Sequence, residues 1–129
     1  MCGIVLVPDT PEYAAITAAL RGPDSISAHK LTLCGVQYIL KFYRLAVFGD
    51  DKSDQPYIID CPDGARHVYA CNGEIYNWQE LDAATGAEAH GDCWSAAAAL
   101  AKFGWTKGLN KLKGEYAMMR VDGEGIYVA

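Results

Sequence analysis

The chain has 129 residues, of which 51% are hydrophobic and 21% charged, and its formal net charge is −5. These values are typical of one globular domain with a sizeable core. With an acidic balance and no basic run, we expect neither nucleic acid nor an anionic membrane as a partner. No apolar stretch is long enough to span a bilayer, and the start lacks the layout of a signal peptide.

Five cysteines are scattered along the chain, at Cys2, Cys34, Cys61, Cys71 and Cys93. An odd number at wide spacing is not the pattern of a disulfide framework. Free thiols persist in reducing compartments. The sequence therefore predicts a cytoplasmic protein.

The first feature along the chain is a cysteine directly after the initiator methionine. Cys2 has two interpretations. It is a small buried residue that opens a strand, or it becomes the first residue when Met1 is removed. In the second case one residue carries a thiol and a free α-amine, which is a nucleophile with its own base.

The first 24 residues predict a strand, a helix and a turn. Residues 3–7 are apolar and rich in β-branched side chains, which favours a buried strand. Thr10 and Pro11 are typical of a helix start, and Gly22 with Pro23 ends that helix. The helix would present one apolar face, formed by Tyr13, Ile16 and Leu20. Composition predicts that the turn over residues 21–24 is a helix stop with solvated charges.

Two strands are predicted next, over residues 31–40 and 43–48. Arg44 lies between apolar neighbours in the second of them. A buried, unpaired charge is costly, so this arginine needs an anionic partner. The partner is either a structural carboxylate or the carboxylate of a ligand, which arginine can grip with two parallel hydrogen bonds.

Residues 57–60 and 66–71 predict two further strands, joined by a turn over residues 62–64. Asn72-Gly73 is a common hairpin signal, but no returning strand follows it. Instead, Asn77 and Glu80 have the spacing of a capping box and predict a helix that starts at Trp78. The Asn-Gly pair is therefore expected in a loop from strand to helix, where a side-chain amide and a backbone N–H lie side by side as donors.

The last third predicts a helix and a hairpin. Asp92 is expected to cap a helix over residues 93–103, which ends at Gly104. A short helical or irregular link contains Leu109 and Leu112. Residues 115–121 and 126–129 predict two strands around a turn at 122–125.

Metal and cofactor sites have little support. The three histidines, His29, His67 and His90, show no close ligand spacing with cysteines except His90 to Cys93. No glycine loop of the Walker or Rossmann type is present. We expect no metal and no cofactor. The chemistry-bearing residues that remain are Cys2, Arg44, Asn72, Gly73, Glu74 and Asp92.

In their order along the chain, these residues and their neighbours resemble the glutaminase domain of class II glutamine amidotransferases, and most of all that of asparagine synthetases. Each motif alone is weak, but the ordered set with cysteine at position two is specific. The matching pieces are Met1-Cys2-Gly3-Ile4, Arg21-Gly22-Pro23-Asp24, Arg44-Leu45-Ala46-Val47, Gln55-Pro56, Asn72-Gly73-Glu74-Ile75-Tyr76-Asn77, Gly91-Asp92 and Leu112-Lys113-Gly114-Glu115-Tyr116-Ala117.

The resemblance implies an α+β fold of the N-terminal-nucleophile hydrolase type. This is a four-layer αββα sandwich, with two antiparallel sheets between helical layers. Residues 1–129 would form a single glutaminase-like domain without a synthetase domain. Relatives typically continue past residue 129 with Arg-Asp and further strands, so we expect a C-terminally truncated fold. An exposed sheet edge would favour a homo-oligomer.

The resemblance also implies roles for individual residues. Cys2 would attack the side-chain amide of L-glutamine, and the Asn72 side chain with the Gly73 N–H would form the oxyanion hole. Arg44 would hold the substrate α-carboxylate. Glu74 and Asp92 would recognise the rest of glutamine, with Asp92 on the α-ammonium. The remaining wall of the pocket would be formed by backbone groups of Arg44, Leu45, Ala46, Val47 and Phe48.

Three functions follow as hypotheses. The first is a glutaminase that forms a γ-glutamyl thioester on Cys2 and releases glutamate and ammonia, with the ammonia passed to a synthetase in trans. The second is a weak or inactive glutamine-binding module that regulates a partner amidotransferase or synthetase. The third is a structural domain with remnant motifs. The complete set of side chains favours the first, and the early chain end favours the second. The sequence also departs from the family pattern at residues 40–43 and at Cys93-Trp94 after Asp92.

Overall fold

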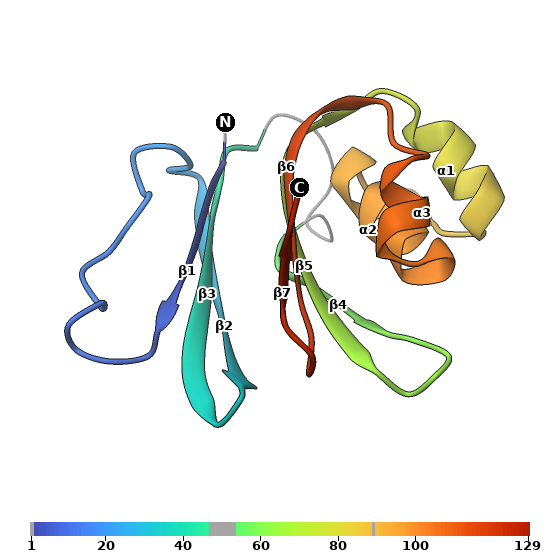
Figure 1. The fold of residues 1–129 in the computed structure, drawn as a ribbon. Helices are drawn as coiled ribbons and strands as arrows, with labels where there is room; N and C mark the ends of the chain where they lie inside the picture. The colour runs from blue at the N-terminus through green and yellow to red at the C-terminus, as the bar shows by residue number, and fades with distance from the viewer. Residues whose placement is uncertain (1, 47–53, 89) are drawn as a thin grey trace.

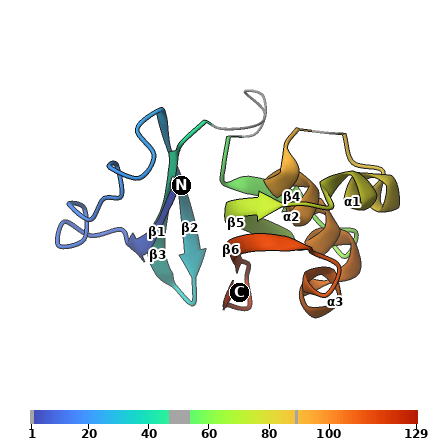
Figure 2. The same ribbon diagram turned by 90° about the horizontal axis from the view of Figure 1, so that it is seen from above.

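The computed structural model describes residues 2–46, 54–88 and 90–129. In this part of the chain two antiparallel sheets pack face to face, and three helices cover the outer face of one sheet (Figure 1 and Figure 2). The predicted α+β sandwich of two antiparallel sheets is therefore confirmed. The layers that these residues form are sheet, sheet and helices.

The first sheet has the strand order β1-β3-β2, with β1 at Gly3–Pro8, β2 at Ser25–Leu33 and β3 at Val36–Arg44. Both outer strands run antiparallel to β3, with Gly3 opposite Tyr43. Cys2 therefore enters the sheet beside the end of β3.

The prediction of one continuous strand over residues 31–40 is wrong. The chain reverses at Cys34 and Gly35, which have φ angles of 50° and 77°, and the two sides pair as β2 and β3. Positive φ at both central residues is the geometry of a tight type I′ hairpin turn. Glycine, asparagine or aspartate is usual at the first of these positions. Cys34 therefore gave no turn signal, and the alternating pattern ran on across the turn.

The second sheet has the order β4-β5-β6-β7. Strand β5, the longest of the four, lies between the first sheet and the helices (Figure 1). The turns predicted at residues 62–64 and 122–125 join neighbouring strands as expected. The four strands are β4 (Tyr57–Asp60), β5 (Arg66–Ile75), β6 (Gly114–Val121) and β7 (Ile126–Val128).

Strand β5 separates two hydrophobic cores. Successive side chains of a strand point to opposite faces. Val68 and Ala70 accordingly pack against Leu40 and Phe42 of β3 between the sheets. Tyr69 and Cys71, with Ile75, face the other way and pack against the helices. The near-continuous apolar run in β5 is explained by burial on both faces.

Three helices follow β5: α1 (Trp78–Thr85), α2 (Asp92–Phe103) and α3 (Trp105–Leu109). The predicted start at Trp78 and the end at Gly104 are confirmed. The predicted capping box does not form, because the Asn77 side chain accepts no bond from a backbone N–H of the helix and, within the helix, only donates to the Glu80 carboxylate at 3.3 Å. Its amide also donates to the Lys111 carbonyl at 2.9 Å and accepts from the Lys113 N–H at 2.9 Å, which ties the start of α1 to the start of β6.

The longest described helix, α2, has 12 residues. A membrane-spanning helix takes about 20. Among the described residues, no helix is long and apolar enough to cross a bilayer.

The helix predicted after Thr10 is also wrong, and residues 9–24 form turns outside the first sheet (Figure 1). A short helix needs an apolar face to bury. Here Ile16 is 43% exposed and Leu20 is fully exposed. The Lys41 ammonium donates to the carbonyls of Ala14 and Ile16, at 2.9 and 3.2 Å. A second helical layer is thus not formed by these residues.

Candidate active site

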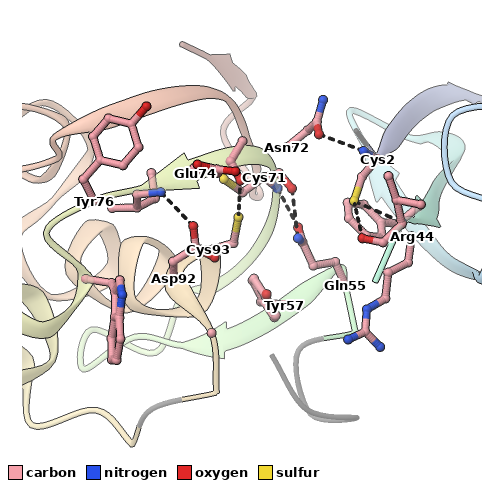
Figure 3. Close-up of a pocket in the computed structure, with 16 residues that line it drawn as sticks. Cys2, Arg44, Gln55, Tyr57, Cys71, Asn72, Glu74, Tyr76, Asp92 and Cys93 are labelled. Carbon is pink, nitrogen blue, oxygen red and sulfur yellow. Dashed lines mark hydrogen bonds between the residues drawn. The ribbon is translucent and has the colours of Figure 1, made fainter. Parts of the chain in front are cut away.

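The start of β1, the end of β3, the end of β5 and the start of α2 meet around one cavity of about 480 Å³ (Figure 3). The antiparallel pairing of β1 with β3 brings Cys2 beside Arg44. The packing of α2 on β5 brings Asp92 beside the end of β5. Seven of the predicted site residues line the cavity: Cys2, Arg44, Leu45, Asn72, Gly73, Glu74 and Asp92.

Cys2 is half-buried and makes contacts to both sheets. Its backbone nitrogen donates to Asn72 Oδ1 at 2.9 Å. Its sulfur accepts from the Leu45 N–H at 3.3 Å and lies 3.7 Å from the Leu45 carbonyl oxygen. The residue also packs against the core between the sheets. Cys2 is therefore held in one orientation, with its thiol at the cavity wall.

The Asn72-Gly73 pair lies inside β5, not in the loop that was predicted. Asn72 pairs with Ala117 and Gly73 with Tyr116 of β6. Because the Cys2 nitrogen can only donate, the oxygen of the Asn72 amide must face it. The NH₂ group of the amide is then the part that can donate elsewhere. The absence of a returning hairpin strand after Gly73 is confirmed, since the chain continues to α1.

Gly73 is required by its neighbours. Its φ is 154°, and a Cβ at this position would collide with the Glu115 carbonyl oxygen and lie 2.5 Å from the Tyr116 Cα. Any other residue would push β5 away from β6. The strand pairing that places Asn72 therefore depends on glycine at the next position.

Arg44 ends β3, and only 14% of its side chain is exposed. Its Nη1 lies 2.9 Å from Asp54 Oδ1, and half of the Asp54 side chain is exposed. Of the two partners considered for this arginine, the structure shows the structural carboxylate. The guanidinium also lines the cavity, where a ligand carboxylate would compete with Asp54.

Asp92 does not cap α2, so that prediction is wrong. It is the first helical residue, Gly91 occupies the cap position, and no side-chain cap bond forms. Its Oδ2 instead accepts from the Ile75 N–H at 2.7 Å. The carboxylate thereby ties α2 to the end of β5 and stands at the cavity.

The Arg21–Asp24 turn supports the same site, which composition alone did not indicate. Arg21 Nε donates to the Cys2 carbonyl oxygen at 3.3 Å. Asp24 accepts from the Ala46 N–H at 2.7 Å, and its own N–H donates to the Arg44 carbonyl oxygen at 3.0 Å. Both residues are solvent-exposed, so their charges are solvated as predicted, but they also bond to backbone groups beside Cys2 and Arg44, and no helix ends at this turn.

Gln55 holds β5 from the cavity side and is itself buried. Its side-chain amide makes two bonds to the Cys71 backbone, with Oε1 2.6 Å from the nitrogen and Nε2 2.9 Å from the oxygen. Its own carbonyl oxygen accepts from the Ser27 hydroxyl of β2. Gln55 thus links the two sheets one residue before Asn72.

The other predicted wall residues differ in placement. Leu45 and Glu74 line the cavity. Ala46 is exposed, is held by Asp24 and is not among the described lining residues. The predictions for Val47 and Phe48 lie outside the described residues.

Several lining residues were not predicted. Gln55 was noted only as part of a matching motif and Cys93 only as a departure from the family pattern. Tyr76 was noted only within a matching motif and Trp78 only as a helix start. Tyr57 carries no sequence signal, because it approaches the cavity from β4. Burial raises the pKa of Tyr57 above its usual range, so this phenol is neutral at physiological pH.

The cavity combines a thiol, amide and backbone donors, one guanidinium and carboxylates. In the described part of the chain, no group of three or more His, Cys, Asp or Glu side chains is arranged to hold a metal ion. Guanidinium and carboxylate on different walls suit the two ends of an amino acid. A thiol near amide donors suits attack on a carbonyl carbon whose oxygen becomes negative.

Comparison with known proteins agrees with this chemistry. A family model described as a glutamine amidotransferase domain matches residues 1–126. The comparison with curated proteins gave no match. The activity that the family match supports is amidotransfer with glutamine as the substrate. Since the match covers nearly the whole length, the chain belongs to the glutamine amidotransferase domain family.

Proposed function

We propose that this protein hydrolyses the side-chain amide of L-glutamine, with Cys2 as the nucleophile after removal of Met1. One observation carries the proposal. The Cys2 nitrogen lies 2.9 Å from Asn72 Oδ1, and both residues line the same cavity. This contact supports the proposal, because it joins the proposed nucleophile to the proposed oxyanion donor on the other sheet.

The proposed reaction has two steps. The Cys2 sulfur attacks the amide carbon, and the carbonyl oxygen becomes an oxyanion that the Asn72 amide and the Gly73 N–H stabilise. The C–N bond breaks, the nitrogen takes a proton, and ammonia departs, so that a γ-glutamyl thioester remains on Cys2. Water then attacks the thioester carbon, releases glutamate and restores the thiol.

The α-amine of Cys2 is the proposed base. In peptides an α-amine has a pKa of about 8 and a thiol a pKa of about 8.5, so the free energy of proton transfer between them is close to zero. The amine can accept a proton only when Met1 is absent, because an amide nitrogen is not a base. A free amine still has N–H groups, so it can keep the contact with Asn72.

Recognition of glutamine would use opposite charges on different walls. Arg44 is the proposed partner of the α-carboxylate, and Asp92 that of the α-ammonium, with Glu74 nearby. Arg44 must exchange part of its contact with Asp54 for the substrate. Asp54 is half exposed, so water can solvate its carboxylate when the substrate replaces it.

The Arg44–Asp54 ion pair also favours a second function. A guanidinium already paired with Asp54 binds glutamine less tightly than one that is preorganised for a ligand. The alternative is therefore a weak or inactive glutamine-binding module that regulates a partner amidotransferase or synthetase. If the glutaminase function holds, a synthetase acting in trans is the partner that the ammonia would serve.

Two measurements on the same preparation test the proposal. Intact mass shows whether Met1 is removed, and a coupled assay measures glutamine-dependent ammonia release. We expect release from the processed protein, none from Cys2→Ala, and unchanged release from Cys34→Ser, whose residue is exposed in the β2–β3 turn. Processed protein that binds glutamine calorimetrically without releasing ammonia would support the alternative function instead.

A further inference from the structure

Two cysteines that the proposed reaction does not use lie in the same cavity as Cys2. Cys71 is in β5, and only 1% of it is exposed, whereas Cys93 is half-buried in the first turn of α2. Both line the cavity, and both belong to the core between β5 and α2 (Figure 3). Each is the chain neighbour of a proposed binding residue, Asn72 for one and Asp92 for the other.

The side chains of Cys71 and Cys93 lie close together at the cavity (Figure 3). The Cys93 thiol hydrogen-bonds with the Cys71 side chain, and this bond, with burial, raises the pKa of Cys93. The Cys93 sulfur also lies 3.8 Å from the Gly73 carbonyl oxygen. Two thiols that hydrogen-bond across a strand–helix interface must approach further to bond, since an S–S bond is about 2 Å long.

We propose that Cys71 and Cys93 form a thiol–disulfide modification site, at which a low-molecular-weight disulfide converts the pair into an intramolecular disulfide. Formation of the bond is independent of the proposed glutaminase function. Its effect on glutamine rests on that function.

The chemistry balances with one molecule of reagent. The Cys93 sulfur is the more accessible of the two, so as a thiolate it attacks one sulfur of the reagent and releases the first small thiol. The Cys71 thiolate then attacks the Cys93 sulfur of the mixed disulfide and releases the second. Two protein thiols are oxidised, the reagent disulfide is reduced to two thiols, and the thiol protons pass to the released groups.

The raised pKa of Cys93 gives the reaction a pH signature. Only the thiolate attacks, and its fraction stays small at neutral pH when the pKa is high. The rate should therefore rise about ten-fold per pH unit between pH 7 and pH 9. A site of this kind responds to a sustained excess of disulfide, not to a brief exposure.

The cross-link would act on the glutamine site through both of its flanks. Forming the bond draws the first turn of α2 toward β5, which shifts Asp92 relative to Asn72 and Gly73. A displacement of about 1 Å in a binding site can reduce catalysis about 100-fold. The oxidised protein should accordingly bind glutamine more weakly than the reduced protein.

Thiol counting with peptide mapping tests the site directly. The folded protein is incubated with 2-hydroxyethyl disulfide, quenched with acid, alkylated under denaturing conditions and weighed. We expect two of its five thiols to be protected from alkylation without an added reagent group, whereas a mixed disulfide, as at exposed Cys34, would carry the mass of one. Trypsin with glutamyl endopeptidase places Cys71 in a peptide over residues 67–74 and Cys93 in a separate peptide, and these two should be cross-linked.

Matched variants make the result decisive. Cys34→Ser should still form the cross-link, whereas Cys93→Ser keeps a hydrogen-bonding group and should not. Full alkylation after treatment at pH 9, or a disulfide that joins Cys2, Cys34 or Cys61 instead, would overturn the proposal.

The effect on glutamine is measured with Cys2→Ala, in which the reagent cannot modify the nucleophile. Calorimetry should show glutamine binding about ten-fold or more weaker in the oxidised form, restored by dithiothreitol. Equal affinity in both forms would refute the effect on the site. If reduced Cys2→Ala binds no glutamine while the cross-link is mapped, the proposed function fails and the modification site stands.

Discussion

Asn72 joins the two sheets through one side-chain amide. Its oxygen accepts from the Cys2 nitrogen at 2.9 Å, which leaves the NH₂ group as the proposed oxyanion donor. These two roles belong to different atoms of the same side chain. Substitutions can therefore remove one role and keep the other.

We predict that Asn72→Asp and Asn72→Ala both lower kcat for ammonia release by about 100- to 1000-fold, because both lose the proposed oxyanion donor. Aspartate keeps an oxygen that can accept from Cys2, and alanine does not. Steady-state kinetics, with circular dichroism as a check on folding, measures the effect. Activity of Asn72→Asp close to wild type would show that the contact to Cys2 matters and the donor does not.

The Arg44–Asp54 ion pair competes with the proposed substrate carboxylate. We predict that Asp54→Asn lowers KM for glutamine by up to about five-fold, because an exposed pair is worth up to about 1 kcal/mol. Arg44→Lys should raise KM, since lysine cannot form two parallel bonds to a carboxylate. The matched control is Asp60→Asn at the end of β4, which breaks an exposed pair with Arg66 of β5 and should leave KM unchanged. A KM that rises in Asp54→Asn would show that Asp54 orients Arg44 instead of competing for it.

At the scale of elements, β5 organises the site. It carries Asn72 and Gly73, is held by Gln55 on one side and receives α2 through Asp92 on the other. Its close approach to β6 depends on Gly73. The site should therefore be more sensitive to a methyl group in β5 than to one in a neighbouring turn.

We predict that Gly73→Ala abolishes ammonia release and destabilises the fold, because its Cβ would meet backbone atoms of Glu115 and Tyr116 that cannot move independently. The control is Gly64→Ala, in the β4–β5 turn. There φ is 83° but no atom lies within 4 Å of the added Cβ, so we expect a cost of only about 1–2 kcal/mol and unchanged kcat. Urea denaturation and the ammonia assay distinguish the two. Wild-type stability of Gly73→Ala would contradict the strand approach described here.

At the scale of the whole molecule, burial determines how stability responds to pH. Tyr57 is 4% exposed and packs edge-on against Trp94 in the core under the helices. Burial raises the pKa of Tyr57 above the unfolded value of about 10. Above that pH the unfolded chain loses this proton while the folded chain keeps it.

Stability should therefore be unaffected by Tyr57 below about pH 10 and should fall as pH rises above it. We predict that Tyr57→Phe makes this alkaline decline shallower by up to about 1.4 kcal/mol per pH unit. Urea midpoints at pH 8, 10 and 11 measure the slope. Tyr76→Phe, at a residue that is 62% exposed, should keep the wild-type slope, and an equal slope in Tyr57→Phe would refute the prediction.

Much of the fold follows from local patterns in the sequence. The apolar run of β1, the strands around residues 62–64 and 122–125, and the helix ended by Gly104 were predicted because periodicity and turn residues act over a few positions. Local patterns failed where a distant partner decides the outcome. The carbonyl groups of Ala14 and Ile16 accept from Lys41, so the helix predicted after Thr10 does not form. The Asn77 amide bonds to residues more than 30 positions away, so the capping box at the start of α1 does not form.

The candidate site divides in the same way. The sequence by itself determined which chemical groups are present, because Cys2, Arg44, the Asn72-Gly73 pair and Asp92 occur in the order of the amidotransferase family. Only the tertiary structure decided their partners: Asp54 for Arg44, Ile75 for Asp92 and the Cys71–Cys93 contact. The physical reason is that hydrogen bonds and ion pairs form between groups brought together by sheet pairing and packing, at separations along the chain that no local pattern encodes.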